Sequence, residues 1–247
     1  MRRAEPAGAA KACYRELDPA RIIETAERLA RRVSERFPEA GLARVAAEFV
    51  TLSRDLARAA ERLAEPIWPA RLLVGLAILA GIGVLFFAGT IVSFNRITPD
   101  AAFDFVQGVE ALMNAGLLVG LGLLALVSLE ERIKRKRAFR ALHGLRSLIH
   151  VVDMHQLTKD PSVLSADFKP TAESPVRITD ASDLSRYLDY CSEMLSLTGK
   201  IAALFAQSVN DAVVIEAVND IENLGSNLSR KIWQKITIIE EFERRRG

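Results

Sequence analysis

The chain has 247 residues, of which 50% are hydrophobic and 26% are charged, and its net charge at pH 7 is +2. This near-neutral balance excludes the global basic footprint of nucleic-acid-binding proteins, so no nucleic-acid partner is expected. Cys13 and Cys191 are the two cysteines and lie far apart in the sequence, which fits a reducing compartment and indicates neither a disulfide framework nor a zinc site.

Residues 1–70 form a first arm, which is expected to fold as two helices at about 19–37 and 42–64. Asp18 is a good N-cap and Pro19 suits the first helical position, so the first helix is expected to begin there. Apolar residues in both helices recur at spacings of three and four, which is typical of helices that pack along one another as in a coiled coil. They are Ile22, Ala26, Leu29, Val33 and Phe37 in the first helix, and Leu42, Val45, Phe49, Leu52, Leu56, Ala59 and Leu63 in the second.

Two long runs without a charged residue, 72–92 and 111–129, follow this arm. A helix rises about 1.5 Å per residue and the hydrocarbon core of a bilayer is about 30 Å thick, so either run can cross a membrane. The alternative, a pair of buried helices in a soluble protein, requires a larger surrounding core than the charged arms supply. Segment 71–129 is therefore predicted to be a transmembrane hairpin with spans at about 71–93 and 105–129.

The distribution of basic residues predicts the orientation of this hairpin. Arg96 is the one basic residue between the spans, whereas a basic cluster follows the second span. Lysine and arginine near the ends of spans stay on the cytoplasmic side, so both termini are expected there. The composition, rich in alanine and arginine, fits a bacterial protein, so the membrane is expected to be the inner (plasma) membrane. The cluster comprises Arg132, Lys134, Arg135, Lys136 and Arg137, which also attract anionic lipid headgroups.

Small residues at four-residue spacing mark both predicted spans. Ala77 and Gly81 lie in the first span, and Gly116 and Gly120 lie in the second. Such pairs allow helix backbones to approach closely in lipid. They serve either to pack the two spans of one chain together or to pack several chains into an oligomer, and the sequence leaves both uses open.

Glu110 and Asn114 form a polar pair beside the second span, one helical turn apart on the same face. An ionisable group inside the hydrocarbon core indicates the lining of a pore or a proton relay. The uncharged run that begins at residue 111 is, however, nearly long enough to cross the membrane by itself. The interpretation that places Glu110 at the outer interface is therefore favoured over an intramembrane site.

Three segments follow the hairpin. Residues 130–157 are predicted to continue the second span into the cytoplasm, and 158–179, with three prolines, is predicted to be an extended linker. Residues 180–247 are predicted to form a helical hairpin that begins with Asp180 or Asp183 as N-cap. Because amphipathic helices cannot bury their apolar faces alone, the two arms are expected to pack as a bundle on each other or on other copies.

The apolar stripes of these segments have the spacing of helices. Gly225 interrupts the last helix and weakens it by up to about 1 kcal/mol, unless close packing uses the missing side chain. The stripes are Leu142, Leu145, Ile149 and Val152 in the continuation, Leu184, Leu188, Cys191, Leu195, Thr198, Ala202 and Phe205 in the first helix of the hairpin, and Val214, Val218, Ile221, Leu228, Ile232 and Ile239 in the last helix.

One cluster on the continuation at 130–157 has candidates for a chemical site, because His143, Arg146, His150 and Asp153 share one face of a helix. The two histidines and Asp153 are residue types that bind a divalent metal. Alternatively, His150 as acid/base and Arg146 as a phosphate ligand would suit phosphodiester cleavage. A structural role, in which these groups hydrogen-bond to neighbouring helices, is favoured because the spacing suits neither local chelation nor a catalytic motif. No catalytic residue, metal or cofactor is thus expected.

The sequence therefore predicts an all-α protein that combines a two-span transmembrane hairpin with a cytoplasmic helical bundle. The favoured function is a non-enzymatic, membrane-anchored interaction or scaffold module. Its expected partners are the lipid bilayer and either other copies of the chain or a helical protein, and a small-molecule ligand is left open. A first alternative is a membrane-perturbing or pore-forming effector, because the architecture resembles the two-span effector modules of bacterial conflict systems. A second is a metal-dependent or nuclease-like enzyme that uses the histidine face.

Overall fold

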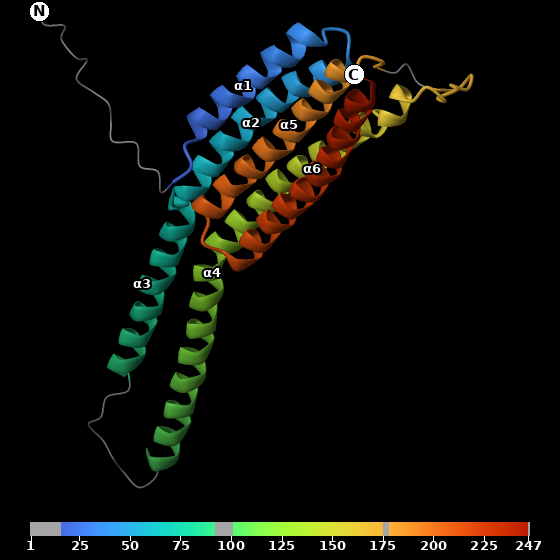
Figure 1. The fold of residues 1–247 in the computed structure, drawn as a ribbon. Coiled ribbons are helices and arrows are strands. Elements are labelled where there is room, and N and C mark those ends of the chain that lie inside the picture. The colour runs from blue at the N-terminus through green and yellow to red at the C-terminus, as the bar shows by residue number, and fades with distance from the viewer. Residues whose placement is uncertain (1–15, 92–100, 175–177, 247) are drawn as a thin grey trace, which may run out of the picture. The chain divides into compact units, whose positions relative to one another are not determined.

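The computed structural model describes residues 16–91, 101–174 and 178–246, and the regular elements in these ranges are all helical (Figure 1). The expected all-α class is confirmed. The chain divides into two compact units. Met1–Ala64 and Arg137–Gly247 together form what we call the bundle unit, and Glu65–Lys136 forms the two-helix unit. Cys13 and the predicted outer-loop residue Arg96 lie outside the described residues.

The bundle unit is built from both predicted arms. Its first helix begins at a side-chain cap, since Asp18 accepts a hydrogen bond from the amide of Ala20, with Pro19 at the first helical position. The first helix of the C-terminal hairpin begins in the same way, because Asp180 accepts a bond from the amide of Asp183. The elements are α1 (Pro19–Arg36), α2 (Gly41–Ala64), the part of α4 (Ala101–Leu157) from Arg137 onward, η1 (Pro161–Leu164), α5 (Ala181–Ser208) and α6 (Ala212–Arg246).

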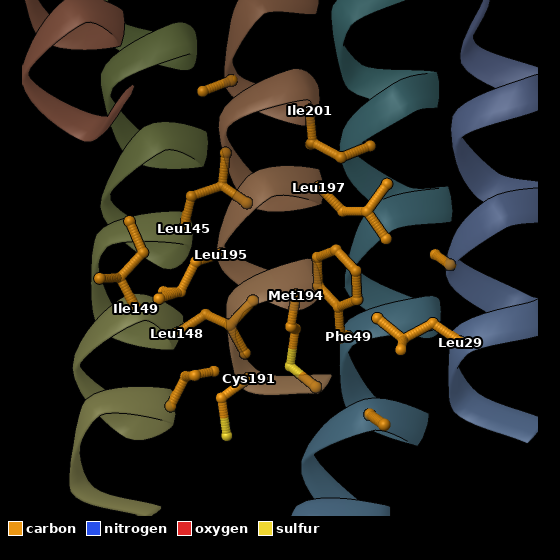
Figure 2. Close-up of a cluster of buried hydrophobic side chains, with 14 of the residues drawn as sticks. Leu29, Phe49, Leu145, Leu148, Ile149, Cys191, Met194, Leu195, Leu197 and Ile201 are labelled. Atoms are coloured by element: carbon orange, nitrogen blue, oxygen red, sulfur yellow. The ribbon is translucent and has the colours of Figure 1, made fainter. Parts of the chain in front are cut away.

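Helix α5 occupies the centre of the bundle unit. It lies between α4 and α2, with α1 beyond α2 (Figure 2), and it also packs against α6. Every stripe residue predicted in α5 and α6 is buried, and so are Leu142, Leu145, Ile149 and Val152 of α4. Phe49 of α2, Met194 of α5 and Leu145 of α4 therefore contribute to one continuous core (Figure 2). Each arm buries its apolar face against the other.

The linker predicted at 158–179 contains a short element that its prolines do not reveal. Residues Pro161–Leu164 form the one-turn 3-10 helix η1, which Asp160 caps by accepting a hydrogen bond from the amide of Ser162. Pro161 and Leu164 are buried, and η1 packs against α6. This segment therefore extends the core instead of only connecting two helices.

The two-helix unit contains α3 (Trp68–Ile91) and the part of α4 up to Lys136. Near one end of α3, the backbone amide of Ile67 donates to Glu130 of α4, and farther along α3 Gly81 lies against Val119. The contacting residue number falls from Glu130 to Val119 on α4 as it rises from Ile67 to Gly81 toward the C-terminal end of α3. The two helices therefore pack antiparallel. Two antiparallel helices alone cannot enclose a core.

Candidate functional site

The apolar surface of the two-helix unit is its first functional feature. Large hydrophobic side chains point outward along both helices, and in the described residues one helical stretch, Gly41–Gly83, meets the length and hydropathy criteria for a membrane span. The most apolar window of that stretch is only 6% buried, whereas a core helix of a soluble protein would be mostly buried. Examples of these exposed side chains are Leu72, Leu76, Leu79 and Ile82 of α3, and Met113, Leu117, Leu121 and Leu124 of α4.

The structure distinguishes the small residues in the two predicted spans. Gly81 is buried, and a Cβ atom added there would lie 3.0 Å from Cγ1 of Val119, so Gly81 allows α3 and α4 to approach closely. A Cβ at Gly116 or at Gly120 would meet nothing within 4 Å. Ala77, one turn before Gly81, is half-buried. The first pair thus contributes to packing within the chain, while the face of Gly116 and Gly120 contacts none of the side chains that the structure describes in the two-helix unit.

Glu130 joins the ends of the two helices where the unit begins and ends. Its carboxylate accepts a hydrogen bond from the Ile67 amide at 3.2 Å and pairs with Arg71 and Lys134, each also at 3.2 Å. Burial by itself raises the pKa of Glu130, but the bonds from Ile67, Arg71 and Lys134 lower this pKa more, so it lies below its usual value. Glu130 stays ionised as a clamp between α3 and α4.

Because Lys134 pairs with Glu130, only some cations of the predicted lipid-headgroup cluster remain open. Lys134 is only 17% exposed and is paired with Glu130, so it acts inside the protein. Arg132, Lys136 and Arg137 are exposed, and Arg135 is half-buried and interacts with another group of the protein. The cations that remain open to a headgroup are thus a subset of those that the sequence indicated.

The polar pair beside the second predicted span also faces outward. Glu110 and Asn114 are both exposed on α4 in the two-helix unit. Because they are one turn apart, they lie on the same face of the helix.

The histidine face of α4 does not converge into one site. Arg146 pairs with Asp220 of α6 at 3.6 Å, and together with His143 these residues line a small pocket of about 190 Å³ between α4 and α6. His150 is exposed. Farther along, Asp153 accepts a hydrogen bond from Gln156 at 2.6 Å. Within the described residues, no group of three or more histidine, cysteine, aspartate and glutamate side chains could hold a metal ion.

The end of α4 is instead tied to α6 by a lysine. Lys235 donates hydrogen bonds to the backbone oxygen of Gln156 at 2.9 Å and to its Oε1 at 2.7 Å. Carbonyl groups in the last turn of a helix have no partner within that helix, so Lys235 caps α4 from a neighbouring element. Burial lowers the pKa of Lys235, in opposition to the nearby carboxylates of Asp160 and Asp153. The hydrogen bonds of Lys235 thus hold the end of α4 against α6 and have a structural role.

Sequence reasoning missed a groove between α5 and α6. It has a volume of about 730 Å³, and its lining includes four serines, two glycines and the exposed Trp233. The serines are hard to recognise in the sequence because they come from two helices that pair antiparallel. Trp233 was the one available signal, as a large aromatic residue outside the predicted apolar stripe of the last helix.

Comparison with known proteins gives no relationship for this chain: no family model, no curated protein and no solved structure matches it.

Proposed function

We propose that this chain is an integral membrane protein in which α3 and the first part of α4 cross the bilayer as a hairpin. The outward-facing apolar side chains of the two-helix unit carry this proposal, because they have no core to enter. At about 25 cal/mol per Å², leaving so many leucine-sized side chains in water is unfavourable, and lipid removes that penalty. The bundle unit, whose core is closed by its own helices, is then the part that works in water.

The orientation of the proposed hairpin follows from its charges. Three basic residues are exposed just after the proposed second span, namely Arg132, Lys136 and Arg137. The predicted outer loop contains one basic residue, Arg96. Trp68 is exposed next to the start of α3, in a position that suits an aromatic anchor at the same interface. Both termini and the bundle unit are therefore proposed to lie in the cytoplasm of a bacterial cell.

The proposed role of the bundle unit is protein interaction rather than catalysis, and copies of the chain are proposed to associate in the membrane. The face of Gly116 and Gly120 supports this association, because a Cβ at either glycine would meet nothing within 4 Å. Small residues on an open face allow a second helix to approach closely in lipid. The neighbouring Met113 and Leu117 are exposed and would pack around such a contact.

The membrane proposal can be tested by extraction and by cysteine labelling in cells that produce the protein. Alkaline carbonate is expected to leave it in the membrane pellet. In a Cys13→Ser background, Thr98→Cys is expected to react with a membrane-impermeant maleimide in intact cells, whereas Glu173→Cys is expected to react only after lysis. Release by carbonate would contradict membrane insertion, and labelling of Glu173→Cys in intact cells would contradict the orientation.

The effector alternative is favoured by one observation, namely that Glu110 and Asn114 remain exposed on α4. In an assembly of several chains this polar pair could line a pore, since polar groups inside a membrane usually face a water-filled cavity. Dye efflux from liposomes is the test. Efflux that Glu110→Gln and Asn114→Leu reduce together would support a pore, and intact liposomes at every protein density would favour the interaction module.

A further inference from the structure

The groove between α5 and α6 has the dimensions of a ligand site. Pockets that bind small organic molecules have volumes of roughly 300–1,000 Å³, and this groove has about 730 Å³. Two glycines in its lining allow the helices to approach closely. A Cβ at Gly225 would lie 3.4 Å from the carbonyl oxygen of Leu195, and one at Gly199 would lie 3.6 Å from Cγ of Glu222. Serines surround this contact, so no large side chain fills the space above it.

Ser192 contributes a hydroxyl group to the groove. The residue as a whole is only 9% exposed, and it lines the groove. A ligand with acceptor atoms in the groove would accept a hydrogen bond from this hydroxyl.

The charged side chains of the groove favour an anion. Lys200 leans back along α5, so that its Nζ lies 2.7 Å from Oγ of Ser196, which also lines the groove. Arg230 leans back along α6 and donates to Asn227 at 3.1 Å. Because α5 and α6 are antiparallel, with Gly225 opposite Leu195, these opposite directions bring both cations toward the middle of the groove. Glu222 is the one acidic residue in the lining.

Trp233 contributes a flat apolar surface at the Arg230 end. Its side chain is 54% exposed although α6 buries seven other apolar residues, and it lines the groove. An indole ring packs well against another ring or an apolar group, and its N–H is a further donor. Serine hydroxyls, two cations and the indole N–H together present more donors than a carboxylate can occupy, whereas phosphate has an additional acceptor oxygen.

We propose that the α5–α6 groove binds a phosphate group attached to an apolar or ring-shaped organic part, as in a phosphorylated small molecule or a lipid headgroup. Lys200, Arg230 and the serine hydroxyls bind the phosphate, and Trp233 contacts the organic part. This site lies within the bundle unit and does not depend on the proposed membrane insertion.

Fluorescence of Trp233 provides the test, because the chain has two tryptophans and Trp68→Phe leaves Trp233 as the single emitter. The full chain, in nanodiscs of phosphatidylcholine, is titrated with phenyl phosphate. Saturable quenching is expected, and Lys200→Gln or Arg230→Gln is expected to weaken the binding at least about tenfold, since each removes a charge-assisted hydrogen bond. Ser192→Ala is expected to weaken it without lowering the melting temperature.

Matched controls separate this site from general attraction of anions. Lys231 is an exposed cation next to Arg230 in the sequence but outside the groove, so Lys231→Gln is expected to leave the affinity unchanged. An equal loss in Lys231→Gln, equal quenching by phenol, or no saturable quenching would each overturn the proposal. Nanodiscs of phosphatidylglycerol distinguish the source: competition with phenyl phosphate identifies a lipid headgroup, and an unchanged affinity identifies a soluble phosphate ester.

Discussion

Single residues show where the packing of the bundle unit is not optimal. Ser53 on α2 is fully buried, and its Oγ is the one buried side-chain oxygen without a hydrogen-bond partner among the described residues. Thr198 on α5 is equally buried but donates a hydrogen bond to the backbone oxygen of Met194 at 2.8 Å. The two hydroxyls are thus equally buried, but only that of Thr198 has a hydrogen-bond partner.

We therefore predict that Ser53→Ala stabilises the protein by about 1 kcal/mol, because it removes a polar group that is desolvated without compensation. For a chain of this size the melting temperature is expected to rise by roughly 2–4 °C. Thermal unfolding in detergent, followed by circular dichroism, measures the change. Thr198→Val is the control and is expected to give no gain. A lower melting temperature for Ser53→Ala would show that the hydroxyl does have a partner.

His155 predicts a pH dependence of stability. Its imidazole packs against Gly41 at the start of α2, where a Cβ would lie 2.5 Å from Cε1 of the ring. Burial, followed by the positive charges of Lys159 and Arg44, lowers the pKa of His155 in the folded protein. The unfolded chain then binds the proton more readily. Stability is therefore complete above the ordinary histidine pKa of about 6.5 and is lost as the pH falls through the folded-state pKa.

Melting temperatures measured between pH 7.5 and pH 5 test this prediction. His155→Gln is expected to make the curve flatter in this range, because the replaced side chain does not titrate. His150→Gln, at an exposed position on the same helix, is the matched control and is expected to keep the wild-type dependence. A wild-type dependence in the His155 variant would assign the effect to other groups.

At the scale of elements, Gly81 and Gly116 of the two-helix unit are expected to respond differently to substitution by a larger residue. Gly81→Leu is predicted to separate α3 from α4, because its Cβ already lies 3.0 Å from Val119, and thus to lower the melting temperature in detergent. Gly116→Leu has open space and is predicted to leave the melting temperature unchanged while reducing association between chains. Crosslinking in membranes measures this association. The reverse pattern would mean that Gly116 packs within the chain.

The elements also show why stripe analysis identified some faces and missed others. A single apolar stripe was predicted for α5, and all of its residues are buried. Tyr187, Met194 and Ile201 lie outside that stripe and are buried as well, because α5 is surrounded by α1, α2, α4 and α6. Periodicity detects one buried face of a helix, but a helix at the centre of a bundle has several.

At the scale of the whole molecule, the bundle unit has a hydrophobic core of its own, in which α1 and α2 pack against α5, and α5 packs against α6. We predict that it folds without the two-helix unit. When Glu65–Lys136 is replaced by a flexible linker of about 12 residues, which spans roughly 20 Å, the product is expected to be soluble, helical and cooperative in unfolding. Sedimentation and circular dichroism measure these properties. Aggregation of the product, or loss of a cooperative transition, would contradict this division of the chain.

The sequence by itself determined the local features of this protein. Asp18 with Pro19 marked the first helix, the spacing of apolar residues marked the buried stripes, and the uncharged run at 72–92 marked a helix that could cross a membrane, since caps, periodicity and length depend on neighbours along the chain. The tertiary structure alone decided that the two arms share one core, that Gly81 and not Gly116 packs within the chain, that Arg146 pairs with Asp220, and that serines of α5 and α6 border a common groove. These features depend on which helix faces which, and residues distant in sequence select their partners only when the chain is folded.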